Sequence, residues 1–138
     1  MALRLNGVIE TALYVDDLDR ACRFYEDVLL LSAMSRDSRF CAYDVGGRSV
    51  LLLFKRGSTL DTVKLPGGTI PPHDGNGPIH IGLSVDRDGL REWEAHLAQH
   101  DVAIEGRTEW PRGGSSIYFR DPDRHLLELV TPGVWPIH

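Results

Sequence analysis

The sequence predicts an α+β protein built from two copies of one module, each a strand and a helix followed by two or three more strands. The order of apolar periodicities repeats along the chain. When the first half is shifted by 70 positions, residues 7–16 align with 77–86 and share five identities in ten. The 138 residues therefore suit a single domain, 1–138, with modules at about 7–54 and 78–131 joined by a linker at 55–77.

The first module begins with an alternating strand, in which Leu13 and Val15 lie on the opposite face from Tyr14. The carboxylates of Asp16 and Asp17 precede an apolar stripe with helical spacing, which indicates a capped helix. The Gly46-Gly47 pair is typical of a hairpin turn. The predicted strand, helix and three strands lie at 7–15, 18–31, 33–36, 39–45 and 48–54.

The linker at 55–77 is polar, holds five glycines and three prolines, and has no clear period. A long loop in a compact domain is usually functional or mobile. We therefore expect the linker to lack secondary structure and to close over a binding cavity.

The second module repeats the same order of elements. Ile79, Ile81 and Leu83 alternate with the polar side of a strand, and Leu90, Trp93 and Leu97 have helical spacing. The turn at 121–124 joins the last two strands. The predicted strand, helix and three strands lie at 78–85, 88–100, 102–105, 115–120 and 125–130.

Charge and composition exclude several classes of protein. With 15 basic and 20 acidic residues the net charge is −5, and no basic cluster suggests a nucleic-acid partner. The longest apolar run, 50–54, is far shorter than the roughly 20 residues of a membrane span. Cys22 and Cys41 are interpreted as reduced core residues, and no targeting signal is apparent. We therefore expect a cytoplasmic protein with neither a nucleic-acid nor a membrane partner.

The repeat also places two polar residues at one position. The shift of 70 aligns Glu10 with His80, and each lies opposite the apolar stripe of its strand. A helix must cover each apolar stripe. The polar faces are therefore expected to line a concavity.

Three stretches resemble the vicinal oxygen chelate superfamily, which includes glyoxalase I, fosfomycin resistance enzymes, extradiol dioxygenases and metal-free bleomycin-binding proteins. They are ETALYVDDLDRACRFYEDVL at Glu10–Leu29, HIGLSVD at His80–Asp86 and DPDRHLLEL at Asp121–Leu129. The resemblance implies two tandem βαβββ modules that form a curved, mostly antiparallel sheet around a metal-binding cavity. It also implies a homodimer.

The resemblance implies that Glu10, His80 and Glu128 bind one divalent metal ion per site. Leu52 stands where some relatives carry a fourth, acidic ligand, and Glu10 stands where they usually carry histidine. Two carboxylates and one imidazole can bind Mn, Fe, Ni, Mg or Zn and leave positions for a chelating substrate. We expect Glu10 and Glu128 to be catalytic as well, with Glu10 either a ligand or a general base.

Six residues are expected to contact the substrate, on the basis of strand alternation and the position of the linker. They are Tyr14, Tyr43, Leu52, His73, Tyr118 and Arg120. The leading hypothesis is a metal-dependent enzyme that acts on a small molecule with two adjacent oxygens, by lyase or isomerase chemistry. An extradiol ring-cleavage dioxygenase and a metal-free small-molecule or drug-binding protein are the alternatives.

Overall fold

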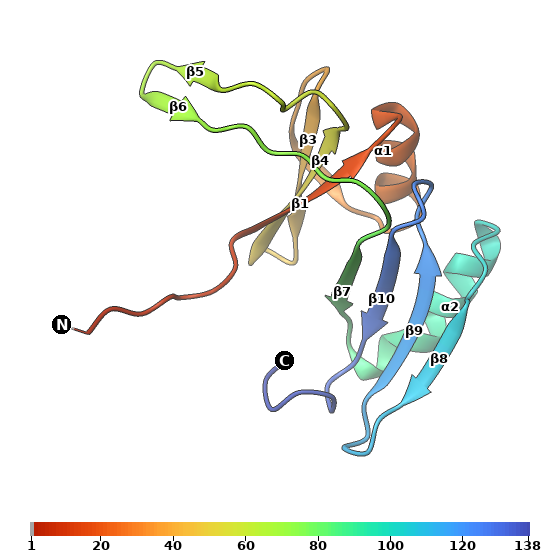
Figure 1. Cartoon of the computed structure of the whole chain (residues 1–138). Helices are drawn as coiled ribbons and strands as arrows, with labels where there is room; N and C mark the ends of the chain where they lie inside the picture. Colours follow the sequence, from red (N-terminus) through yellow and green to blue (C-terminus); the bar gives the residue numbers. More distant parts are fainter. Residues whose placement is uncertain (1) are drawn as a thin grey trace. The chain divides into compact units, whose positions relative to one another are not determined.

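The computed structural model describes residues 2–138 and shows two compact units (Figure 1). The first unit ends at Asn76 and the second spans Gly77–His138. Each unit contains a four-stranded mixed sheet and one α-helix, which confirms the predicted α+β class. None of the helices formed by residues 2–138 has the length and apolar character needed to cross a membrane.

The first unit has the strand order β1-β4-β3-β2, with β1 parallel to β4 and the other neighbours antiparallel. Its elements are β1 (Glu10–Val15), α1 (Leu18–Asp27), β2 (Ser32–Arg36), β3 (Phe40–Val45) and β4 (Ser49–Lys55). The parallel pair is possible because α1 supplies the crossover between β1 and the sheet. The predicted elements are all present in this unit, with ends shifted by a few residues.

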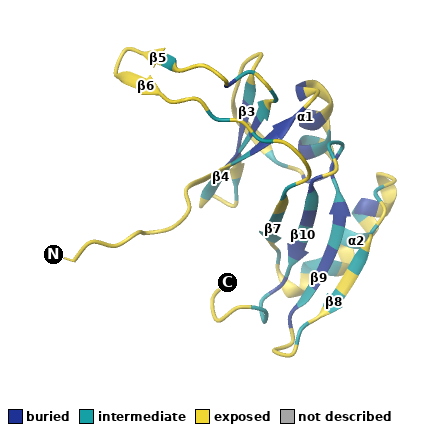
Figure 2. Ribbon diagram, viewed as in Figure 1, coloured by how far each residue is buried: buried dark blue, intermediate teal, exposed yellow. Residues whose placement is uncertain are grey.

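Helix α1 packs its apolar stripe on one face of this sheet. Asp17 caps the helix, because its carboxylate accepts a hydrogen bond from the backbone N–H of Arg20 at 3.1 Å. The helix ends at Asp27, earlier than predicted, and Leu30 adopts a positive φ of 60°. Figure 2 shows buried residues of the first unit in α1 and in the strands beside it. The buried set between helix and sheet includes Leu13, Val15, Ala21, Cys22, Tyr25, Cys41, Tyr43, Leu51 and Leu53.

The prediction that the linker lacks secondary structure is wrong. Strands β5 (Val63–Leu65) and β6 (Gly68–Ile70) form a two-stranded antiparallel hairpin within it. The base of the linker is fastened to the first unit. The Arg56 guanidinium donates to the carbonyl of Gly75 at 3.0 Å, and the backbone N–H of His73 donates to the carbonyl of Thr59 at 2.9 Å. Closure of the linker over a cavity stays a prediction.

The second unit repeats the arrangement, with the strand order β7-β10-β9-β8 and a parallel β7–β10 pair. Its elements are β7 (His80–Ser84), the 3₁₀ helix η1 (Arg87–Gly89), α2 (Leu90–Gln99), β8 (Gly106–Glu109), β9 (Ser115–Arg120) and β10 (Leu126–Val130). Helix α2 covers one face of the sheet (Figure 1). The most deeply buried apolar residues of this unit are Leu97, Ile117, Phe119, Leu127 and Leu129.

One predicted strand of the second unit is misplaced. Residues 102–105 form a connection rather than a strand, and β8 begins at Gly106. The connection is held at both ends, since the N–H of Val102 donates to the carbonyl of Leu97 and the N–H of Glu105 donates to that of Tyr118. Only from Gly106 onward do successive residues pair with β9, so the ladder starts there.

Candidate metal centre

The parallel strand pair of each unit has the same register as that of the other unit, and this defines equivalent positions in the two sheets. In the first unit Glu10 pairs with Val50, and Ala12 pairs with Leu52. In the second unit His80 pairs with Leu126, and Gly82 pairs with Glu128. Glu10 is therefore equivalent to His80. Leu52 is equivalent to Glu128.

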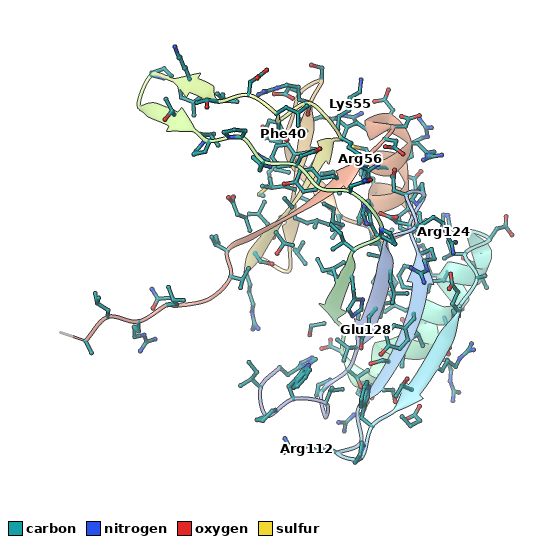
Figure 3. The ribbon with its side chains drawn as sticks, in the orientation of Figure 1. Phe40, Lys55, Arg56, Arg112, Arg124 and Glu128 are labelled. Atoms are coloured by element: carbon teal, nitrogen blue, oxygen red, sulfur yellow. The ribbon has the colours of Figure 1, made fainter. Side chains whose placement is uncertain are left out.

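His80 and Glu128 come together on the face of the second sheet that is opposite the apolar stripe. The His80 Nε2 atom lies 3.1 Å from the Glu128 Oε1 atom. The side chain of Glu128 is 12% exposed and that of His80 is 50% exposed, so the pair opens to solvent from the histidine side. Figure 3 shows Glu128 on β10. Gly82 lies beside the carboxylate, since a Cβ built there would be 3.7 Å from Oε1.

The orientation of the His80 ring makes this pair suitable for a cation. The His80 Nδ1 atom lies 3.0 Å from the carbonyl oxygen of Leu126, which can only accept, so Nδ1 carries a proton and donates it to that carbonyl. The other ring nitrogen, Nε2, therefore faces the Glu128 carboxylate oxygen. At this separation of 3.1 Å either a proton or a metal ion can lie between the two atoms. Neighbouring ligands of an octahedral ion with bonds of about 2.1 Å are about 3 Å apart, so the pair fits two metal ligands.

The other carboxylate oxygen of Glu128 is occupied by a buried hydroxyl. The Ser116 Oγ atom donates to Glu128 Oε2 at 2.5 Å, and Ser116 is 1% exposed. Trp110 in turn donates its indole N–H to Ser116 Oγ at 2.8 Å. Ser116 lies two residues before Tyr118 on β9 and therefore on the same face of the sheet. Nothing in the sequence indicated Trp110. Its position depends on the turn at 110–114.

Glu10 is an exposed residue at the start of β1, in the first unit. Among residues 2–138 no group of three histidine, cysteine, aspartate or glutamate side chains is gathered around one point. The structure therefore brings His80 and Glu128 together, while the role of Glu10 stays a prediction from the repeat and the family resemblance.

Tyr14 and His73 form a hydrogen-bonded pair within the first unit. The Tyr14 hydroxyl lies 2.6 Å from His73 Nδ1, and both rings contact Phe54. Burial, together with the nearby Asp74 carboxylate, raises the pKa of Tyr14 above its ordinary value. Leu52 is half-buried on the same sheet face as Tyr14. These three predicted substrate contacts thus share one side of the first unit.

Tyr118 and Arg120 lie on the Glu128 face of the second sheet, because Tyr118 pairs with Glu128 and Arg120 with Leu126. The Tyr118 and His80 rings are 6.3 Å apart. The Arg120 guanidinium is already engaged, since it donates to Glu105 Oε2 and to the carbonyl of Arg124, each at 3.1 Å. Tyr118 is therefore the better placed of the two for a contact with a substrate bound at His80.

The expectation that Tyr43 lies on the cavity face is wrong. Tyr43 is fully buried under α1, where its ring stacks on Tyr25 and its hydroxyl donates to Glu26 Oε2 at 2.8 Å. The alternation along β3 puts Cys41 and Tyr43 on the helix side, and Phe40 and Ala42 on the other. Tyr43 is thus part of the core.

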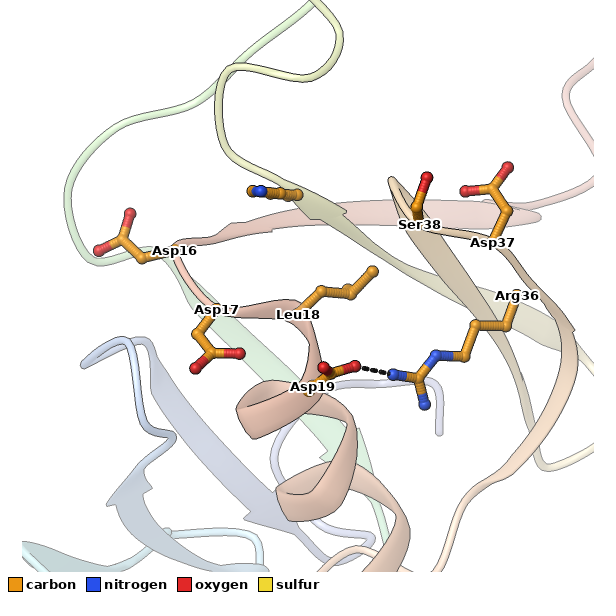
Figure 4. A pocket seen from close by; sticks show the side chains of 8 residues that line it. Asp16, Asp17, Leu18, Asp19, Arg36, Asp37 and Ser38 are labelled. Atoms are coloured by element: carbon orange, nitrogen blue, oxygen red, sulfur yellow. Dashed lines mark hydrogen bonds and ion pairs between the residues drawn. The ribbon is translucent and has the colours of Figure 1, made fainter.

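An open cavity of about 500 Å³ lies elsewhere in the first unit, near the start of α1 (Figure 4). Most of its charged side chains have structural partners. Asp17 caps the helix, Asp19 pairs with Arg36, and Asp37 accepts hydrogen bonds from the backbone of residues 39 and 40. The cavity is lined by Asp16, Asp17, Leu18, Asp19, Arg36, Asp37, Ser38 and Lys55. These pairings engage Asp17, Asp19, Arg36 and Asp37 without a ligand.

Comparison with protein families identifies the chain. Residues 7–129 match the model of the Glyoxalase/Bleomycin resistance protein/Dioxygenase superfamily. The chain belongs to this superfamily. The match spans both units and confirms the resemblance of the three sequence stretches.

Members of the superfamily with known names are similar over nearly the whole chain. The crystal structure of lactoylglutathione lyase from Agrobacterium tumefaciens has a TM-score of 0.87 and 30% identity, covering 96% of this chain and 98% of that one. The metallothiol transferase FosB of Bacillus licheniformis is 27% identical, covering 96% of this chain and 79% of its own. FosB of Staphylococcus epidermidis is 28% identical, covering 94% and 84%. These names support an enzyme of this superfamily.

Proposed function

We propose that this protein is a divalent-metal-dependent enzyme that acts on a small molecule through two adjacent oxygens. The observation that carries this proposal is the His80–Glu128 pair, in which the imidazole Nε2 and a carboxylate oxygen face each other at 3.1 Å. The names of the relatives agree, since they include metallothiol transferases and a lyase.

His80 and Glu128 would hold the metal, with Glu10 as the predicted third ligand. A bound divalent ion supplies Lewis acidity, which stabilises negative charge that develops on the substrate oxygens. A ligand set rich in carboxylates favours Mn, Fe, Mg or Ni, and Zn also accepts nitrogen and oxygen ligands. An uncoordinated Glu10 would instead accept a proton from the substrate, the role of a general base.

The remaining residues of the second unit would orient these groups. The Leu126 carbonyl holds the His80 ring in the orientation that turns Nε2 toward Glu128. Glu128 keeps one oxygen toward His80 while Ser116 holds the other. Tyr118 lies beside the His80 ring and would pack against the bound substrate.

Lyase or isomerase chemistry of the glyoxalase type is the favoured reaction, because the lactoylglutathione lyase structure matches almost end to end. Thiol transfer is the second candidate, because the FosB relatives are named for it. A homodimer remains the expected assembly. A dioxygenase would require a redox-active iron, and a metal-free binding protein would bind no metal at all.

Metal stoichiometry tests the proposal directly. The protein is stripped of metal, titrated with Mn²⁺, Ni²⁺, Fe²⁺ and Zn²⁺, and the bound ion is counted per chain. We expect one ion in the wild type and none in His80→Ala or Glu128→Gln. His100→Ala is the matched control, because it also removes an imidazole from the second unit, but at the C-terminal end of helix α2 rather than on the sheet. Full retention of metal in His80→Ala would refute the assigned site.

Glu10→Gln separates the two roles of Glu10. Loss of the bound ion indicates a ligand, whereas retained metal with lost turnover indicates a base. Turnover is measured in two assays, one for conversion of lactoylglutathione and one for transfer of a small thiol to fosfomycin. Fosfomycin is chosen because a similar structure, with a TM-score of 0.64 and 23% identity, is that of the fosfomycin resistance protein FosX from Mesorhizobium loti. Metal-dependent turnover in the first assay favours the lyase, and in the second the transferase.

A further inference from the structure

We infer that Ser116 and Trp110 are positioning residues that fix the carboxylate of Glu128 for metal binding. The inference rests on the proposed function, because it assigns a purpose to the way Glu128 is held. Both residues lie in the second unit, behind Glu128 as seen from His80, and neither belongs to the predicted ligand set. Their contacts form one continuous chain from Trp110 through Ser116 and Glu128 to His80.

The chemistry of the donors sets the direction of every hydrogen bond in this chain. An indole N–H can only donate, so Ser116 Oγ accepts from Trp110 at 2.8 Å. The single hydroxyl proton of Ser116 is then directed to Glu128 Oε2, at 2.5 Å. A hydrogen bond to a charged carboxylate is short and about twice as strong as a neutral one. The chain therefore holds Oε2 in place and leaves the second oxygen, Oε1, turned to His80.

The backbone around Trp110 is built to hold the indole in place. The N–H of Trp110 donates to the carbonyl of Gly114 at 2.8 Å, and the N–H of Gly113 donates back to the carbonyl of Trp110 at 2.9 Å. This turn packs closely against the C-terminal segment, since a Cβ at Gly114 would lie 2.7 Å from the carbonyl carbon of Gly133. Trp110 thus occupies a fixed site rather than an adaptable one.

Loss of the hydroxyl would free Glu128 to rotate and would leave Oε2 without its buried donor. Removing a residue that orients a metal ligand typically weakens metal binding by about 10- to 100-fold. We expect Ser116→Ala to weaken Mn²⁺ binding by that factor. Trp110→Phe keeps an aromatic ring but removes the N–H, so its effect should be smaller and in the same direction.

The experiment measures Mn²⁺ affinity by competition with a chelator and records the absorption spectrum of the Co²⁺-loaded protein. Ser115→Ala is the matched control for the hydroxyl, because Ser115 is the neighbour on β9 and donates to the exposed Glu109 instead. Trp135→Phe is the control for the indole, because Trp135 lines the same surface pocket as Trp110 but lies in the C-terminal tail. Thermal unfolding of each variant checks that it is folded.

A relay also predicts non-additivity and rescue. Trp110→Phe should add little in the Ser116→Ala background, because the indole acts through the hydroxyl. Ser116→Thr, which keeps a hydroxyl, should restore most of the affinity and the wild-type Co²⁺ spectrum. Should Ser116→Ala fail to fold, Trp110→Phe and Ser116→Thr still test the relay.

Affinities of Ser116→Ala and Trp110→Phe equal to those of their controls would overturn this inference. If His80→Ala still abolishes metal binding in that case, the proposed metal centre stands without the relay. Wild-type protein that binds no Mn²⁺ or Co²⁺ would overturn the metal centre and the relay together.

Discussion

Leu52 of β4 and Glu128 of β10 occupy the same position in their sheets. Each lies on an inner strand of its sheet and pairs with a residue of the parallel edge strand, Leu52 with Ala12 and Glu128 with Gly82. The second unit carries a carboxylate where the first carries an isobutyl side chain. This difference suggests a direct way to alter the metal centre.

We predict that Leu52→Glu tightens metal binding and lowers turnover. A carboxylate at this position would add an anionic ligand, replace a coordination site that the substrate needs, and reduce Lewis acidity. The expected gain in affinity is about tenfold, or about 1.4 kcal/mol. It is measured by chelator competition, and turnover is measured on the same samples.

Leu52→Gln is the control for this change, since it has nearly the same size and polarity without the charge. If both variants bind Mn²⁺ as the wild type does, Leu52 does not face the metal. The equivalence of Leu52 and Glu128 would then have no functional meaning.

Gly75→Ala should destabilise the protein, because the return of the linker passes directly over the Tyr14 ring. A Cβ at Gly75 would lie 2.4 Å from Tyr14 Cδ2, and that ring is held by His73 and Phe54. Overpacking of this kind typically costs about 1–3 kcal/mol. Gly67→Ala is the matched control within the same linker, because apart from its chain neighbours no atom of the described residues lies within 4 Å of a Cβ there. Urea unfolding of the two variants should show a loss in the first alone.

Stability should fall in alkaline solution, starting near pH 9. Burial raises the pKa of the Cys41 thiol above its ordinary value of 9.0, and burial also raises that of the Tyr43 hydroxyl. The unfolded chain loses these protons first, so the free energy of unfolding decreases as the pH rises past the unfolded value. Each such group contributes a slope of at most about 1.4 kcal/mol per pH unit.

Urea unfolding between pH 7 and 10.5 measures this slope. Cys41→Ala should flatten the curve just above pH 9, whereas Asp44→Asn, an exposed change on the same strand, should not. Equal slopes in Cys41→Ala and the wild type would contradict the assignment.

The alternation of apolar residues predicted most elements, because each four-stranded sheet buries one face under a helix. It failed at Tyr43, where both sides of β3 carry apolar side chains, Phe40 and Ala42 on one and Cys41 and Tyr43 on the other. Periodicity alone does not say which of two apolar faces a helix covers. It also misplaced the strand at 102–105, because pairing begins only where β9 offers a partner.

The β5–β6 hairpin had a visible signal in the Pro66-Gly67 dipeptide, which is typical of turns and joins the two strands. The His80 and Glu128 positions followed from the repeat and the family resemblance, and the structure brings their side chains together. Trp110 could not be predicted, because its contact with Ser116 depends on how the turn at 110–114 meets the C-terminal segment.

The hydrogen bonds at the base of the linker divide it into a part that can change in length and a part that cannot. Because Arg56 holds Gly75 and Thr59 holds His73, the segment between these anchors can gain or lose residues at the hairpin tip without moving Tyr14. The anchors themselves tolerate no such freedom, and Gly75 has no room for any side chain. Length variation among homologues should therefore concentrate between β5 and β6, which makes this hairpin the natural place to graft a new recognition loop.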